Sequence, residues 1–282
     1  MIELSAASVL LQWASGGLFF LWVTGRWREV GIGYGWTMRI TFGLMAAGAV
    51  VVGLLVDPNP VREGAGVGVV AATTVAMVVS VLRRRAGVSG QRGVDERRTA
   101  RVAAMTGIDR SAQSFNIGPE FPPHLDAVAP LLGLVGLVAA GLTAGEPVVL
   151  SVARLLVGAA FLGAVSDAML LGHWYLVQPG LARGPLIELV WWTGLIWPLE
   201  LAVLLWPTGM ISVLNGSIDD GYNGLLGWFW VASTLGTLIL VLTARAALRE
   251  RQYAAVMAAT GLLYLAILTA FSMDLVARAI LS

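Results

Sequence analysis

The sequence contains no cysteine and no lysine, and it has only two histidines. The absence of cysteine excludes disulfide bonds, thiolate catalysis, and iron–sulfur or thiolate-held zinc sites. The absence of lysine excludes a Walker-type phosphate loop, and neither an HExxH nor a GxSxG motif is present. All eighteen basic residues are therefore arginine. The exclusive use of arginine agrees with a compositional bias that also favours alanine, glycine and valine. In the alternative interpretation, the guanidinium groups recognise carboxylate or phosphate.

Charge of either sign is scarce as well. Charged residues make up 12% of the chain and hydrophobic residues 57%, with a mean hydropathy of +0.80. A soluble domain carries roughly 25% charged residues, so water could not cover a surface this poor in charge. We therefore expect membrane lipid to be the solvent and partner of most of the surface. The net charge of +1 gives no general attraction to nucleic acid.

Apolar runs long enough to cross a bilayer, which takes about 20 residues, occur eight times. They predict an all-α, polytopic bundle that forms a single membrane domain over residues 1–282. No basic residue precedes the first run, so we expect a spanning helix there and not a secretory signal. The expected helices cover about 4–24, 36–56, 64–82, 126–144, 147–177, 185–206, 224–247 and 253–280.

The arginines test this count, because basic residues gather in the cytoplasmic connections of membrane proteins. Fourteen of the eighteen arginines fall in the four connections that share a side with the loop 83–125, whereas only Arg62 falls in the opposite connections. We therefore expect this loop in the cytoplasm, both termini on the outer side, and the chain in a bacterial cytoplasmic membrane. No inverted repeat of the transporter kind is evident.

The loop 83–125 is the only sizeable polar segment. Its middle, 95–105, can form a short helix with three arginines on one side, which is typical of a helix that lies on anionic headgroups or binds a protein. The alternative is a solvated linker whose charge fixes the topology. If the loop binds a membrane or cytoplasmic partner, the chain is a scaffold or assembly factor.

Six ionisable side chains from four expected helices share one depth near the cytoplasmic surface. Such groups are costly inside a membrane, so by default they form a functional hypothesis. We expect Asp167, His173 and Glu188 to point into a common chamber. The full set is Arg39, His124, Asp126, Asp167, His173 and Glu188.

A quinone headgroup would suit this chamber, because it needs a proton donor and an acid in an apolar, aromatic slot. His173 is the natural proton carrier near neutral pH, Asp167 and Glu188 would exchange protons, and Arg39 would balance their charge. Nearby aromatic residues would line the slot: Trp174, Tyr175 and Trp192. The sequence thus predicts a membrane subunit or accessory protein of a respiratory or redox system.

Other interpretations of the same residues remain open. A haem b would require His124 and His173 as its axial ligands, since the chain has no other histidine. A metal site would add Asp126 and Asp167, without the tight histidine spacing typical of such sites. In the purely structural interpretation each group is paired with a neighbour, and the tryptophans belong to the interfacial belt.

A small-molecule or ion transporter is the alternative from a different class. It requires a continuous polar path from the inner residues to a second, smaller group in the outer half. Arg154 and Glu200 would form the outer gate of this path. The outer group contains Arg154, Glu200, Asp274 and Arg278.

The segment LLGHWYLVQPGL, residues 170–181, resembles a segment of uncharacterised multi-span membrane proteins of bacteria. The resemblance covers little more than this segment and implies no activity. It singles out His173, Trp174 and Tyr175 as a unit.

Overall fold

The computed structural model describes residues 5–90, 104, 118–145, 147–178 and 181–281. These residues form an all-α chain with eight helices that are long and apolar enough to cross a membrane. The predicted fold class is therefore confirmed, and the chain is a multi-pass membrane protein. The expected surface helix over 95–105 lies almost wholly outside the described residues.

The spanning helices follow the expected order, with short irregular connections between most of them. They are α1 (Ala6–Gly25), α2 (Ile32–Val56), α3 (Pro60–Leu82), α5 (Leu125–Thr143), α6 (Val148–Val177), α7 (Gly184–Leu205), α9 (Leu225–Ala247) and α10 (Tyr253–Leu281). Two short elements were not predicted, a 3-10 turn at Arg84–Ala86 and the helix α8 at Gly209–Leu214.

Helix α3 begins four residues earlier than expected, and its first turn explains why. Pro60 occupies the first turn, where its missing N–H costs nothing, and the side chain of Asn59 caps the helix by accepting a hydrogen bond from the Arg62 amide at 3.1 Å. Arg62 and Glu63 then neutralise each other inside the helix, with Nη2 and Oε1 2.8 Å apart. Because these two charges are paired, the helix continues through them, and α3 begins before Arg62 and not after Glu63.

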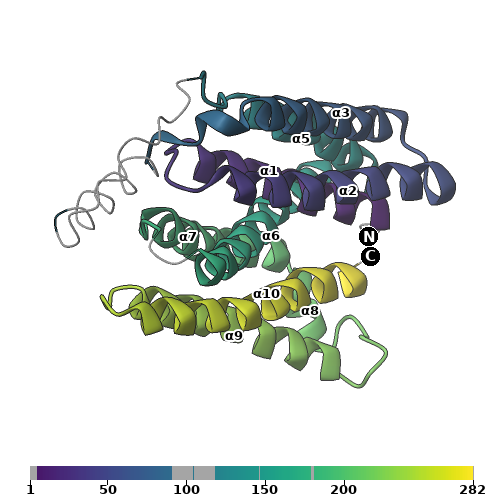
Figure 1. The fold of residues 1–282 in the computed structure, drawn as a ribbon. Helices are drawn as coiled ribbons and strands as arrows, with labels where there is room; N and C mark the ends of the chain where they lie inside the picture. The colour runs from purple at the N-terminus through teal and green to yellow at the C-terminus, as the bar shows by residue number, and fades with distance from the viewer. Residues whose placement is uncertain (1–4, 91–103, 105–117, 146, 179–180, 282) are drawn as a thin grey trace.

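The eight spans form two rings of four helices, one after the other in the chain. In the first ring α1 packs on α2, α2 on α3, α3 on α5, and α5 closes back on α1. In the second ring α6, α7, α9 and α10 pack in the same order. Figure 1 shows the two rings stacked, with α1 and α6 facing each other at the centre. Each half therefore repeats the same helix arrangement, a relation that was not apparent in the sequence.

The two halves meet where α1 crosses α6, and the backbones there are nearly in contact. A Cβ on Gly16 would lie 1.8 Å from the carbonyl oxygen of Ala159, and a Cβ on Gly163 would lie 2.2 Å from the carbonyl carbon of Gly16. Only glycine permits such an approach, and small residues are the usual means by which membrane helices pack closely. The crossing therefore fixes the position of one half on the other.

Near this crossing, one spacing of two glycines and a tryptophan occurs in both halves. In α1, Gly16 is followed nine residues later by Gly25, and Trp27 comes two residues after that; in α6 the same spacing joins Gly163, Gly172 and Trp174. The connections that follow, 26–31 and 178–183, have equal length. The halves therefore correspond helix by helix in the same orientation, which differs from the inverted repeats considered above.

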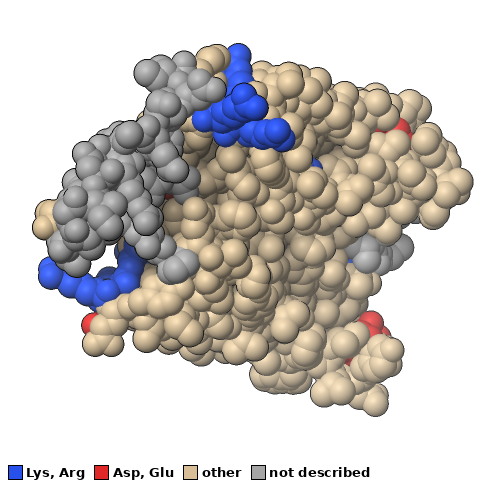
Figure 2. Space-filling view, in the orientation of Figure 1, with Lys and Arg blue, Asp and Glu red and all other residues tan. Residues whose placement is uncertain are grey.

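The two ends of the bundle differ in charge. The chain termini lie at one end, here called the terminal end, and the arginines of the connections after α1, α3, α6 and α9 mark the opposite, arginine-rich end. Figure 2 shows blue arginine atoms toward the arginine-rich end and acidic patches toward the terminal end on the visible face. This asymmetry is what the expected cytoplasmic orientation of the loops would require.

We expect Gly163→Ala to destabilise the bundle, because its new Cβ has no space against the α1 backbone. Overpacking of this kind costs about 1–3 kcal/mol, and the thermal midpoint of the purified protein in detergent should fall. The control is Gly261→Ala in α10, where a Cβ meets nothing within 4 Å, and which should melt at or above the wild type. Equal midpoints for the two variants would contradict the close crossing.

Candidate functional site

A buried polar cluster lies in the terminal half of the bundle, at the point where α1, α6, α7 and α10 approach one another. Its members each have at most 6% of their surface exposed. We call it the terminal-end cluster, and it consists of Gln12, Arg154, Glu200, Asp274 and Arg278. Four of the five belong to the outer group predicted from the sequence, and Gln12 adds a contribution from the first half.

Most donors of the terminal-end cluster are paired. Arg278 donates from Nε to Asp274 Oδ1 at 2.7 Å and from Nη2 to the carbonyl of Arg154 at 2.7 Å. Gln12 Nε2 lies 3.5 Å from Asp274 Oδ2. Gly158 leaves the space that these groups need, since a Cβ there would lie 2.4 Å from both Arg278 Nη2 and Gln12 Nε2.

Arg154 and Glu200 do not form the direct gate pair expected from the sequence. Arg154 donates instead to two carbonyl groups at the end of α7, from Nε to Val203 at 2.7 Å and from Nη2 to Trp206 at 2.9 Å. Neither carboxyl oxygen of Glu200 accepts a hydrogen bond from the described residues, although the side chain is fully buried. The amide oxygen of Gln12 is likewise without a donor there.

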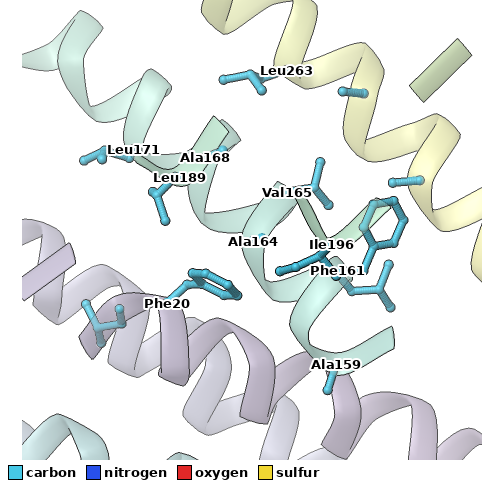
Figure 3. Packing of buried hydrophobic residues seen from close by; sticks show 14 of the residues in the cluster. Phe20, Ala159, Phe161, Ala164, Val165, Ala168, Leu171, Leu189, Ile196 and Leu263 are labelled. Atoms are coloured by element: carbon cyan, nitrogen blue, oxygen red, sulfur yellow. The ribbon is translucent and has the colours of Figure 1, made fainter. Parts of the chain in front are cut away.

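An apolar layer separates this cluster from the ionisable groups nearer the arginine-rich end. Phe20, Phe161, Ala164, Val165 and Ile196 are buried side chains of the layer. Figure 3 shows Phe20 reaching from α1 toward α6 beside Ala164 and Ile196. Among the described residues, buried apolar side chains therefore lie between the terminal-end cluster and Asp167.

At the arginine-rich end, Arg39 and Asp126 form a buried ion pair between α2 and α5. Nε and Nη2 of Arg39 donate to the two carboxylate oxygens of Asp126 at 2.8 and 2.7 Å, and the ring of Phe121 lies 4.4 Å from the guanidinium carbon. Nη1 of Arg39 has no partner among the described residues. It borders a cavity of about 50 Å³, which is large enough for a water molecule.

Asp167 is the second buried acid of this region, and none of the described arginines pairs with it. It lies next to the hydroxyl of Tyr34 on α2, and neither of its oxygens has a hydrogen-bonding partner within the described ranges. Both side chains are buried. A carboxyl group in this setting is costly, which keeps Asp167 a functional candidate.

Glu188 and His173 do not join Asp167 in a common chamber. Glu188 lies near the start of α7, where it accepts hydrogen bonds from Arg26 and from Trp27 Nε1, the latter at 2.8 Å. His173 faces the other way and shares a 2.9 Å hydrogen bond through Nδ1 with the hydroxyl of Tyr264 on α10. Asp167 therefore faces α2 and His173 faces α10, because different positions on α6 face different neighbours, whereas Glu188 of α7 contacts the connection after α1.

The two histidines also have separate surroundings. His124 is the exposed cap residue at the start of α5, which packs against α1, α3 and α6, whereas His173 lies on the α10 side of α6. Among the described residues there is no group of three or more acids and histidines arranged to hold a metal ion. The geometry gives no support to a haem held by both histidines.

The aromatic residues of the expected slot have structural partners of their own. Trp174 packs against Tyr34, with ring centroids 6.2 Å apart, and donates to Gln178 at 3.1 Å. The hydroxyl of Tyr175 donates to the carbonyl of Ala182, which ties the end of α6 to the following connection. Trp192 packs against Phe20, and its buried Nε1 has no acceptor in the part of the chain that the structure describes.

An apolar groove of about 550 Å³ opens between α1, α5 and α6. Such a volume is within the range of small-molecule sites, about 300–1,000 Å³. Trp22 lines it toward the arginine-rich end, one helical turn before Arg26, whose guanidinium lies 5.9 Å from the Trp22 ring. Its wall includes Ser15, Phe19, Trp22, Pro130, Leu134 and Leu156.

Arg62, the single arginine of the opposite connections, has a structural role at the terminal end. Besides Glu63, its guanidinium binds the hydroxyls of Ser5 and Ser8 at 3.0 and 3.1 Å and the carboxylate of Asp57 at 3.0 Å. The hydrogen bond from Arg62 holds the pKa of Asp57 below its usual value. These contacts join the start of α1, the end of α2 and the start of α3. All three guanidinium nitrogens of Arg62 donate hydrogen bonds in them.

No family model, curated protein or solved structure matches this chain. The candidate sites therefore rest on the geometry alone.

Two residues of the candidate sites were not predicted from the sequence, Gln12 and Tyr34. Gln12 is an amide within an apolar run, and such a residue faces the bundle interior for the same reason that an acid does. Tyr34 follows a glycine-rich turn, so its inclusion in α2 was not expected. The signal for Gln12 was present, whereas the partner of Tyr34 depends on how α2 packs against α6.

We expect the Arg39–Asp126 pair to be strongly coupled in stability. Arg39→Met or Asp126→Leu alone leaves a buried charge unpaired, which costs about 3–5 kcal/mol, whereas an apolar replacement of both partners costs far less. The measurement is a double-mutant cycle by unfolding in denaturing detergent. The control is Glu188→Gln, which weakens a partly exposed pair and should cost about 1 kcal/mol or less. Additive effects of the two substitutions would contradict the coupling.

Proposed function

We propose that the chain is a membrane carrier for a small polar or ionic solute, whose two four-helix halves move against each other in a bacterial cytoplasmic membrane. One observation carries the proposal. Polar residues from both halves meet at two depths, with a closed apolar layer between them. At the terminal end Gln12 of the first half meets Asp274 of the second, and toward the arginine-rich end Tyr34 meets Asp167.

The arrangement of the halves supports this function. Carriers built from two repeats that share one orientation bind their solutes near the middle of the membrane, at the interface between the repeats. Ionisable residues in such places commonly mark solute or proton pathways. The closed layer around Phe20 and Phe161 then belongs to an occluded state of the carrier. Opening toward either side would expose one polar group at a time.

The movement of the two halves can be tested with single introduced cysteines, since the chain has no cysteine of its own. Ser166→Cys is a small change at a buried position, where Ser166 Oγ accepts a hydrogen bond from Trp13 across the interface at 2.8 Å. If the halves alternate, a membrane-impermeant maleimide should label this cysteine slowly from both sides in oriented vesicles. Labelling from neither side would overturn the carrier.

Two further positions control this measurement. Ser217→Cys lies in the exposed connection before α9 at the terminal end, and it should react rapidly from the outer side only, which also tests the expected orientation. Leu268→Cys lies on the exposed, apolar face of α10 and should remain unlabelled from both sides, because lipid covers it.

A prenyl-tailed quinone is the second candidate ligand, and the groove between α1, α5 and α6 favours it. The groove is almost entirely apolar, and its end at Trp22 lies next to the Arg26–Glu188 pair near the start of α7. A prenyl chain would lie in the groove, and the headgroup would lie near Glu188 as its proton exchanger. This site would use Arg26 and Trp22 in place of the expected His173 and Asp167.

Binding of quinone in the groove can be tested with a substitution that fills the groove. Leu134→Trp adds a large side chain to its wall, and we expect any quinone that co-purifies with the wild type to be lost, as measured by organic extraction and chromatography. Leu268→Trp, on the exposed face of α10, is the matched control and should retain it. Wild-type protein without quinone, or equal amounts in both variants, would exclude this candidate.

A further inference from the structure

The terminal-end cluster contains an acid whose hydrogen bonding is unexplained, Glu200. The other acid, Asp274, is paired with Arg278, and both arginines donate to named acceptors. Glu200 is fully buried on α7, and its two oxygens find no donor within the described residues. Five residues separate it from the end of α7 at Leu205, so it lies about 8 Å inside the helix end at 1.5 Å per residue.

An ionised carboxylate in these surroundings would be unfavourable. Transfer of an unpaired charge from water into an apolar interior costs so much that the group takes up a proton instead. As a neutral acid, Glu200 needs only one acceptor for its O–H group. Its neighbour Asp274 provides one, since the two carboxyl groups lie side by side and interact directly. Asp274 can accept this hydrogen bond while it stays paired with Arg278, so the proton itself lies on Glu200.

A second observation also indicates a missing donor at this point. The amide oxygen of Gln12, on α1, is buried and has no donor among the described residues, while its amide nitrogen faces Asp274. A proton on Glu200 can satisfy one of these acceptors. A metal cation is a poorer occupant, because the guanidinium groups of Arg154 and Arg278 in the same cluster would repel it, and because Gln12 and Arg278 already fill the space left by Gly158.

Arg154 is the group that can respond when the proton leaves. It interacts electrostatically with Glu200, yet its guanidinium is held by the carbonyls of Val203 and Trp206, one and two turns farther along α7. A carboxylate accepts a stronger, charge-assisted hydrogen bond than a carbonyl group. Ionisation of Glu200 would therefore draw Arg154 away from the end of α7. The charged groups that face Glu200 are Arg154 of α6 and Asp274 and Arg278 of α10, and Gln12 of α1 contacts Asp274 beside them.

We propose that the terminal-end cluster binds one proton on the carboxyl group of Glu200, and that Arg154 pairs with Glu200 when this proton leaves to water at the terminal end. The proposal deepens the carrier function by naming a proton as the coupled ion, and it rests on that function only for the use of the proton. The binding itself follows from the geometry of the cluster.

The test is an infrared titration of the purified protein in lipid nanodiscs. We expect the wild type to show the carbonyl stretch of a protonated carboxyl group, which shifts in heavy water and disappears as the pH is raised. Glu200→Gln keeps the shape of the neutral acid and should remove this band while the protein stays folded. A band pattern that is the same in the wild type and Glu200→Gln at every pH would overturn the proposal.

Two control variants assign the band. Glu63→Gln removes another buried acid of the terminal end, one that is already paired with Arg62, and it should leave the band unchanged. Asp167→Asn removes the other buried acid without a cation, and it should leave the Glu200 band in place even if it removes a band of its own. Loss of the same band in either control would assign the proton elsewhere and overturn the proposal.

The role of Arg154 is tested separately. Arg154→Met takes away the cation that stabilises ionised Glu200, so the proton should bind at least tenfold more tightly, and the band should persist about one pH unit higher. If the band of Arg154→Met disappears at the same pH as that of the wild type, Arg154 does not pair with ionised Glu200. The outcome for Ser166→Cys is independent of these results. If Ser166→Cys is labelled from neither side while the Glu200 band titrates as expected, the carrier function is excluded and the proton site remains.

Discussion

The close crossing of α1 and α6 is the contact on which the rest of this structure depends. Gly16 and Gly163 bring the two backbones nearly into contact, and both helices are largely buried. Because lipid gives little hydrophobic force between helices, close packing of this kind is what holds a membrane bundle together. The polar groups of both halves then meet on either side of the crossing, with Gln12 on one side and Asp167 on the other.

The buried polar groups fall into two kinds. Some are paired within one half: Arg39 with Asp126 and Arg62 with Glu63 in the first, and Arg278 with Asp274 in the second. Asp167 and Glu200 lie in the second half, are fully buried and lack hydrogen-bonding partners among the described residues. A protein that only needed stable packing would gain little from such groups, and the proposed carrier function depends on these two.

The sequence allowed the spans to be predicted but not the partners of their polar residues. Length and hydropathy determine where a helix crosses the membrane, and the eight predicted spans are present in the structure. The positions of Asp167, His173 and Glu188 along their helices were also readable from the sequence. Their directions were not, because the neighbour that each helix face meets depends on the packing of all eight helices. Asp167 thus faces Tyr34, while His173, six residues later, faces Tyr264.

The terminal-end cluster illustrates the same limit. Arg154 and Glu200 were expected to pair because their charges are opposite and their depths are similar. In the structure Arg154 satisfies the carbonyl groups at the end of α7, and Asp274 and Arg278 pair one helical turn apart on α10. Local partners along one helix, and unpaired carbonyls at the end of another, compete with pairing between helices.

Each ring contains an even number of spans, so each half starts and finishes on the same side of the membrane. Only the few residues between Thr143 and Val148 join the halves. Two copies of such a unit can be linked in one chain, or separated again, without an additional crossing and without reversal of either copy.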